Sequence, residues 1–182
     1  MFEKVTKTNS FLLIKILGWL QIIGGLFGIG LMGKLMLQTG TINGALLLIF
    51  LLGVSLFIFS IHTGKKLLLD ADKKQGIIIS IVNQSLQIVQ FNLLGYGFSY
   101  SSCILISVGI KGTFFSFNFE AALATFQMSI GTDDPSFIRV NIVAILLIAL
   151  LANILKAIKP TSNSQAEITE PTKSEDTLHA IE

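Results

Sequence analysis

The sequence has little of the charge and the chemistry that soluble enzymes and nucleic-acid-binding proteins usually carry. Of its 182 residues 13% are charged, one is a cysteine and one, Arg139, is an arginine. An average soluble domain is about 25% charged. A single cysteine excludes an intramolecular disulfide and a cysteine-rich metal site. The scarcity of arginine argues against a nucleic-acid surface, so we expect no nucleic-acid partner.

Sequence signatures of common catalytic sites are also missing. The chain has no HExxH zinc motif, phosphate-binding loop, dinucleotide fingerprint or recognisable Ser/His/Asp set. Its two histidines do not suggest a shared metal site, because His62 ends a hydrophobic segment and His179 lies in a polar tail. We therefore expect no enzymatic activity, no cofactor and no metal.

What the sequence has instead is long hydrophobic runs, and 52% of all residues are hydrophobic. Residues 11–37 contain Lys15, Gln21 and Lys34 as their only clearly polar side chains. The run from Ala45 to Ile61 contains only two serines that are polar. About 20 apolar helical residues cross the hydrocarbon core of a bilayer. We predict spanning helices at about 11–37 and 44–62, joined as an antiparallel hairpin by a short polar link.

Two further segments are predicted to span the membrane. Residues 137–158 are mostly apolar, with Arg139 near their start, and end beside Lys156 and Lys159. Residues 76–95 are apolar on average but carry five amide side chains. A helix lying on the membrane is an alternative for this segment, but such helices are usually rich in lysine or arginine on their polar side. Residues 76–95 have neither, which favours a spanning helix.

Lysines indicate the orientation of these segments. Four of them bracket the loop after the second hydrophobic run, at Lys65, Lys66, Lys73 and Lys74. Lysines and arginines in short loops mark the cytoplasmic side, so we expect this loop and residues 1–10 in the cytoplasm. Four spans place the C-terminal lysines on the same side, whereas three would not. Residues 160–182 hold five acidic residues against one lysine, which predicts a disordered acidic cytoplasmic tail.

The stretch between the last two predicted spans has a different periodicity. Phe115, Phe117 and Phe119 alternate with polar residues, and a period of two is typical of half-buried strands. We predict a β-rich external segment at about 96–134. The sequence leaves open whether residues 91–110 instead continue the third span as a helix. The expected fold class is membrane all-α: a four-span domain over residues 11–159 with a short external β-rich segment.

Two groups of residues are candidates for a site. Asn83, Gln87 and Gln90 fall on one face of the third predicted helix. These amides either brace the bundle through interhelical hydrogen bonds or line a polar path for a ligand. Gly24 and Gly28 form a Gly-x-x-x-Gly pair, a spacing that lets another helix approach closely, so we expect them to serve helix packing.

Three stretches resemble a known group of proteins. Ile16 to Gln21 (ILGWLQ), the lysine loop and Asn83 to Gln87 (NQSLQ) are similar to stretches of small uncharacterised bacterial multi-pass membrane proteins. The resemblance covers most of the membrane part but not the tail, and it implies no activity.

Our hypothesis is a non-enzymatic integral protein of the bacterial inner membrane, with both termini cytoplasmic. It would be a structural or partner-binding component that contacts the lipid bilayer and has another membrane protein or a second copy of itself as a candidate partner. The alternative is a small transporter or channel subunit that uses the polar stripe.

Overall fold

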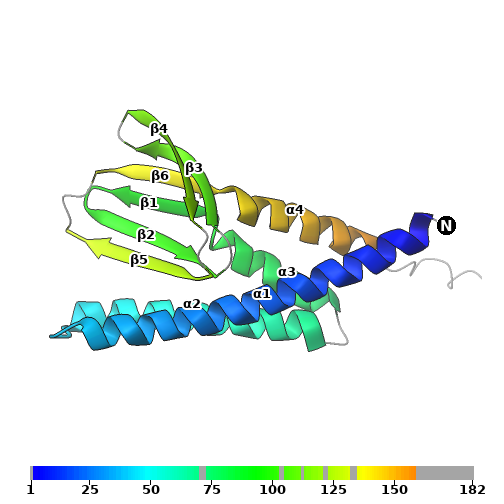
Figure 1. The fold of residues 1–182 in the computed structure, drawn as a ribbon, viewed down its shortest axis with the longest axis horizontal. Helices are drawn as coiled ribbons and strands as arrows, with labels where there is room; N and C mark the ends of the chain where they lie inside the picture. Colours follow the sequence, from blue (N-terminus) through cyan, green and yellow to red (C-terminus); the bar gives the residue numbers. More distant parts are fainter. Residues whose placement is uncertain are drawn as a thin grey trace, which may run out of the picture.

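The structure, a computed structural model, describes residues 2–69, 73–102, 105–111, 113–120, 123–131 and 135–158. Its helices are α1 (Phe2–Gln38), α2 (Gly44–Leu69), α3 (Lys73–Ser85) and α4 (Ile142–Ala157). Its strands are β1 (Val89–Leu93), β2 (Tyr96–Ser101), β3 (Leu105–Lys111), β4 (Phe114–Glu120), β5 (Thr125–Ile130) and β6 (Phe137–Asn141). The sheet lies beside one half of the α1–α2 hairpin, and α3 and α4 lie beside the other half (Figure 1).

The prediction of a four-span all-α protein is wrong. Among the described residues only Phe11–Gln38 and Gly44–Leu69 are helices long and apolar enough to cross a membrane. The expected third span, 76–95, is divided between α3 and β1, and the expected fourth span, 137–158, begins with β6. Of the two misassigned pieces, VQFNL alternates apolar and polar residues throughout, and FIRVN does so from Ile138 to Asn141. Averaged hydropathy hides such alternation, although a period of two favours a strand.

The six strands form one antiparallel sheet in the order β4-β3-β6-β1-β2-β5. The β-structure is therefore larger than the segment expected at 96–134, and residues 91–110 include parts of β1, β2 and β3. The registers give the sheet one apolar and one polar face. The apolar face includes Phe91, Phe98, Val108, Ile110, Phe117, Met128, Ile138 and Val140. The polar face includes Gln90, Asn92, Ser99, Ser107, Ser116, Gln127, Ser129 and Arg139.

The sheet must curl at the end that meets the helices. β4 ends at Glu120 and β5 begins at Thr125, yet these strands are the two edges of the sheet. In a flat sheet the edges would lie about 24 Å apart, whereas the chain from Glu120 to Thr125 reaches at most about 19 Å. The connection therefore draws the two edges toward each other at this end.

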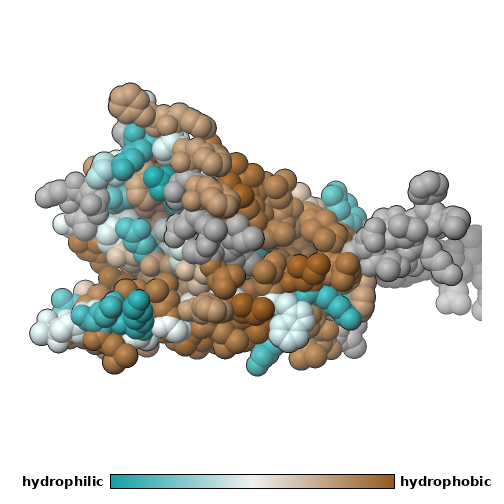
Figure 2. Space-filling model, viewed as in Figure 1, coloured by the Kyte–Doolittle hydropathy of each residue, from teal (hydrophilic) through white to brown (hydrophobic). Residues whose placement is uncertain are grey.

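Two separate hydrophobic cores hold the elements together. The first joins all four helices through Ile14, Leu17, Leu67, Ile77, Leu151 and Ile154. The second joins the hairpin to the sheet, where Phe57 of α2 meets the ring of Tyr100 with centroids 5.4 Å apart. Figure 2 shows hydrophobic residues over the helices and hydrophilic ones gathered on the visible face of the sheet.

β6 passes directly into α4, with no loop between them. Asn141 is the last residue of β6, and its side-chain oxygen accepts hydrogen bonds from the backbone N–H groups of Val143 and Ala144. This is an N-cap, which satisfies donors that the first helical turn leaves free. The backbone N–H of Asn141 donates to the carbonyl of Ile88 at 2.7 Å. We call α3 with β1 (residues 73–93) and β6 with α4 (residues 137–157) the two arms. This hydrogen bond joins the arms where each changes between helix and strand.

Candidate functional site

A group of buried polar side chains fills the place where the hairpin, α3 and the end of β2 meet. None of its members is more than 1% exposed, and none carries a charge. We call this group the polar junction; it consists of Gln21, Ser60, Thr63, Ser80, Asn83, Gln87, Tyr100 and Ser102. Burying such groups is costly unless they are hydrogen-bonded, so their partners decide what the site does.

Ser60 of α2 connects the hairpin to the sheet. Its hydroxyl lies 2.8 Å from the Ser102 hydroxyl and 3.1 Å from the Gln21 carbonyl oxygen. The Asn83 amide of α3 donates to the same Ser60 oxygen at 3.3 Å. A hydroxyl has one proton to donate and two lone pairs to accept with, so Ser60 can donate to the Gln21 carbonyl oxygen while it accepts from the Ser102 hydroxyl and the Asn83 amide.

Gln21 connects α1 to both α2 and α3. Its side-chain oxygen accepts a hydrogen bond from Thr63 at 2.7 Å. Its side-chain nitrogen donates to the hydroxyl of Ser80. One amide in the first apolar run therefore links its own helix, α1, to α2 and α3.

Gln87 connects the segment after α3 to the end of β2. Its side-chain oxygen accepts from the backbone N–H of Ser102 at 3.0 Å, and its side-chain nitrogen donates to the Ser102 hydroxyl at 3.0 Å. Tyr100 adds a third connection, because its hydroxyl donates to the Leu56 carbonyl of α2 at 2.9 Å. These bonds fix the end of β2 against the helices.

The predicted polar stripe is divided by the structure. Asn83 and Gln87 belong to the polar junction, whereas Gln90 lies on β1 and projects from the polar face of the sheet. The side-chain nitrogen of Gln90 is buried and has no hydrogen-bond partner among the described residues. The helical spacing that grouped the three amides ends where α3 gives way to β1.

The two predicted packing glycines face different neighbours. A Cβ on Gly28 would overlap the ring of Phe57 on α2. A Cβ on Gly24 would overlap the Ser102 carbonyl oxygen and lie 2.6 Å from its carbon. Gly28 therefore packs helix against helix, whereas Gly24 admits the backbone that follows β2.

Sequence reasoning missed the other members of the junction. Gln21 and Ser60 stand in apolar runs, and a polar residue at membrane depth is a signal for buried partners. Tyr100 and Ser102 carry no such signal, because only the folded sheet brings them to the helices.

The junction is suited to bracing rather than to proton transfer. It contains amides, aliphatic hydroxyls and one phenol, and none of these is a good general base near neutral pH. No group of three His, Cys, Asp or Glu residues that could hold a metal occurs within the part of the chain that the structure describes.

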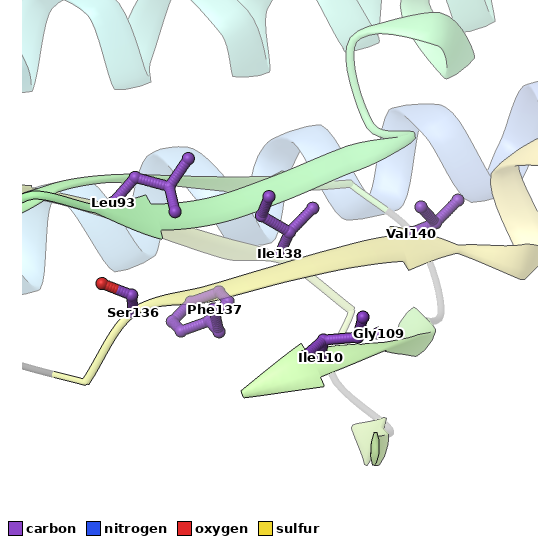
Figure 3. Close-up of a pocket in the computed structure, with 7 residues that line it drawn as sticks. All are labelled: Leu93, Gly109, Ile110, Ser136, Phe137, Ile138 and Val140. Atoms are coloured by element: carbon purple, nitrogen blue, oxygen red, sulfur yellow. The ribbon is translucent and has the colours of Figure 1, made fainter. Parts of the chain in front are cut away.

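A second feature is a shallow apolar cavity on the sheet. It has a volume of about 430 Å³ and is lined mainly by Leu93, Ile110, Ile138 and Val140. Figure 3 shows Leu93, Ile138 and Val140 projecting to the same side of the strands.

Comparisons of this chain with protein families, with curated proteins and with solved structures find no match.

Proposed function

We propose that this chain is a non-enzymatic integral membrane protein, a structural or partner-binding component anchored by the α1–α2 hairpin. Large apolar side chains on the outside of both helices support a lipid contact, because a wide exposed apolar surface is otherwise rare on a monomeric protein. Among these residues are Leu12 (58% exposed), Trp19 (56%), Phe27 (59%), Leu48 (69%) and Leu51 (55%).

The observation that carries the structural role is the hydrogen bonding within the polar junction. Ser60, Gln21 and Gln87 use their polar atoms to join helices and sheet. A net contribution of about 1 kcal/mol for each such bond makes the junction a brace that holds the sheet against the hairpin. A rigid, anchored sheet is suited to contact with the bilayer, another membrane protein or a second copy of the chain.

The orientation that we propose follows from the lysines. Lys65, Lys73, Lys74 and Lys156 belong to the ends of α2, α3 and α4 that lie on the same side of the molecule as the start of α1 (Figure 1). The α1–α2 connection lies at the opposite end (Figure 1). Lysines favour the cytoplasmic side, so both termini are proposed to be cytoplasmic. The resemblance to bacterial proteins suggests the bacterial inner membrane.

Cysteine labelling in right-side-out membrane vesicles tests anchoring and orientation together. In a Cys103→Ser background, a Thr41→Cys variant should react with a membrane-impermeant maleimide from outside. A Leu69→Cys variant should react only after permeabilisation, because Leu69 ends α2 at the lysine-rich side. Extraction of the protein by alkaline carbonate, or labelling of the Leu69→Cys variant in sealed vesicles, would contradict the proposal.

A second function is favoured by buried polar atoms that the junction does not use. The side-chain nitrogens of Gln84 and Gln90 and the hydroxyl of Ser107 have no hydrogen-bond partner among the described residues. Such atoms could line a path for a small uncharged solute, as in a transporter or channel subunit.

Osmotic swelling of proteoliposomes separates the two functions. With glycerol or urea as the solute, transport predicts fast swelling that a Gln84→Leu/Gln90→Leu variant loses without a lower melting temperature. The structural role predicts the same slow swelling as protein-free liposomes for both proteins.

A further inference from the structure

The hairpin covers only half of the apolar face of the sheet. Over β2 and β5, Phe98, Tyr100 and Phe126 pack against Phe57 and its neighbours on the hairpin. Over β1, β6, β3 and β4 the same face is exposed: Val89 46%, Leu93 40%, Ile138 48%, Ile110 57%, Phe115 75%, Phe117 63% and Phe119 61%. The apolar cavity lies in this uncovered half.

The exposed apolar surface of the helices continues without interruption onto these strands. Along one arm it passes from Val82 and Leu86 to Val89 and Leu93 of β1, all at least 40% exposed. Along the other arm it passes from Leu146, Ile145 and Ile142 of α4 to Ile138 of β6. The medium that surrounds the outer sides of α3 and α4, water or lipid, therefore contacts this part of the sheet as well.

The lengths of the arms place the cavity at hydrocarbon depth. If Lys156 marks the cytoplasmic border, the rise along α4 to Ile142 is about 21 Å. A hydrocarbon core of about 30 Å then leaves about 9 Å, or about three strand residues. That distance extends along β6 to the neighbourhood of Val140 and Ile138, which line the cavity.

The backbone of these strands is compatible with that position. A sheet in hydrocarbon needs its N–H and C=O groups paired, and β1, β6 and β3 each lie between two paired neighbours. The free edge of the uncovered half belongs to β4. At one end of β4, Phe114 and its paired residue Lys111 suit the headgroup level. At the other end the curl of the sheet draws the edge of β4 toward β5.

From the continuity of the exposed apolar surface and the depth of the cavity, we propose that lipid acyl chains contact the half of the apolar face that the hairpin leaves exposed. We propose also that the cavity over β1, β6 and β3 holds one acyl chain. On the polar face of the sheet, Gln90, Asn92 and Ser107 are buried, whereas Ser99, Ser116 and Arg139 are partly exposed and face water. This inference rests on the proposed membrane anchoring and extends it, because the sheet itself becomes a lipid-binding surface in the leaflet opposite the lysines.

Tryptophan quenching by bilayer lipids with brominated acyl chains tests this arrangement. Trp19 is the only tryptophan and lies on the exposed side of α1, so the wild-type protein reports on the hairpin alone. In a Trp19→Phe background, Ile138→Trp and Phe117→Trp place a reporter on the apolar face, and Ser99→Trp places one on the polar face. We expect brominated chains to reduce fluorescence from the two apolar-face variants at least twofold, and aqueous acrylamide to quench the Ser99→Trp variant preferentially.

Each outcome separates this inference from the membrane anchoring. Quenching of Trp19 together with the Ile138→Trp variant supports both. Quenching of Trp19 without quenching of either apolar-face variant overturns the lipid-covered sheet but keeps the anchor. A failure of brominated lipid to quench Trp19 overturns the anchor itself. If copies of the chain cross-link through Phe117→Cys in the Cys103→Ser background while the apolar-face variants stay unquenched, a second copy covers the face and the lipid proposal is wrong.

Discussion

The Gly24→Ala variant is expected to lose about 3 kcal/mol or more of its free energy of unfolding. The added Cβ would overlap the Ser102 carbonyl oxygen, and it would lie 2.9 Å from the Leu123 carbonyl oxygen. These are backbone atoms, and Gln87 holds the Ser102 N–H on the other side. Overpacking typically costs about 1–3 kcal/mol when side chains can shift, and here the backbone would have to move. Denaturation in mild detergent micelles, followed by circular dichroism, measures the loss.

Gly30→Ala is the matched control on the same helix. A Cβ at Gly30 has no heavy atom within 4 Å, and alanine favours a helix over glycine by about 1 kcal/mol. The control is therefore expected to be neutral or slightly stabilising. Equal stabilities of the Gly24→Ala and Gly30→Ala variants would mean that the end of β2 does not pack against α1 at Gly24.

Replacing two amides of the predicted stripe with leucine is expected to give opposite results. Gln87→Leu leaves the buried Ser102 N–H without its acceptor and should destabilise the protein by about 2–4 kcal/mol. Gln90→Leu removes a buried side-chain nitrogen that has no described partner, and should leave stability unchanged or increase it. The same detergent denaturation measures both variants.

An equal loss in the two leucine variants would contradict the division of the stripe. It would mean that Gln87 and Gln90 share one environment, as a continuous third helix requires. A loss confined to Gln90→Leu would place the important hydrogen bonds on the polar face of the sheet instead.

The hairpin could be predicted because its signal is local. The runs that contain α1 and α2 are long and continuously apolar, and both helices are long enough to cross a membrane. β4 is similarly local, since Phe115, Phe117 and Phe119 alternate with polar residues within one strand. In both cases the pattern that predicts the element lies inside the element.

β1 and β6 could not be predicted in the same way. Each has only five residues. β6 adjoins the strongly apolar α4, and β1 follows the isoleucine-rich part of α3, so the average hydropathy of the window is that of a span. Their pairing, Val89 with Val140 and Phe91 with Ile138, joins residues far apart in the chain. Tertiary context of this kind routinely overrides local propensity.

The site was predicted only in its α3 part for the same reason. Asn83 and Gln87 are four positions apart and share a side of the chain as a helical pattern predicts. Their partners Ser60 and Ser102 come from α2 and from the end of β2. Single amides and serines in a sequence do not reveal which distant hydroxyl they meet.

The polar junction joins the hairpin to the sheet, and the Ser60–Ser102 hydrogen bond of 2.8 Å links the two directly. A double-mutant cycle with Ser60→Ala and Ser102→Ala, measured by unfolding in detergent, isolates this link. A matched cycle pairs Ser102→Ala with Ser55→Ala, since Ser55 bonds only within its own helix among the described residues. We predict a coupling energy of about 0.5–1.5 kcal/mol for the first cycle and additivity for the second. Additivity in both cycles would mean that the Ser60–Ser102 hydrogen bond does not hold the hairpin and the sheet together.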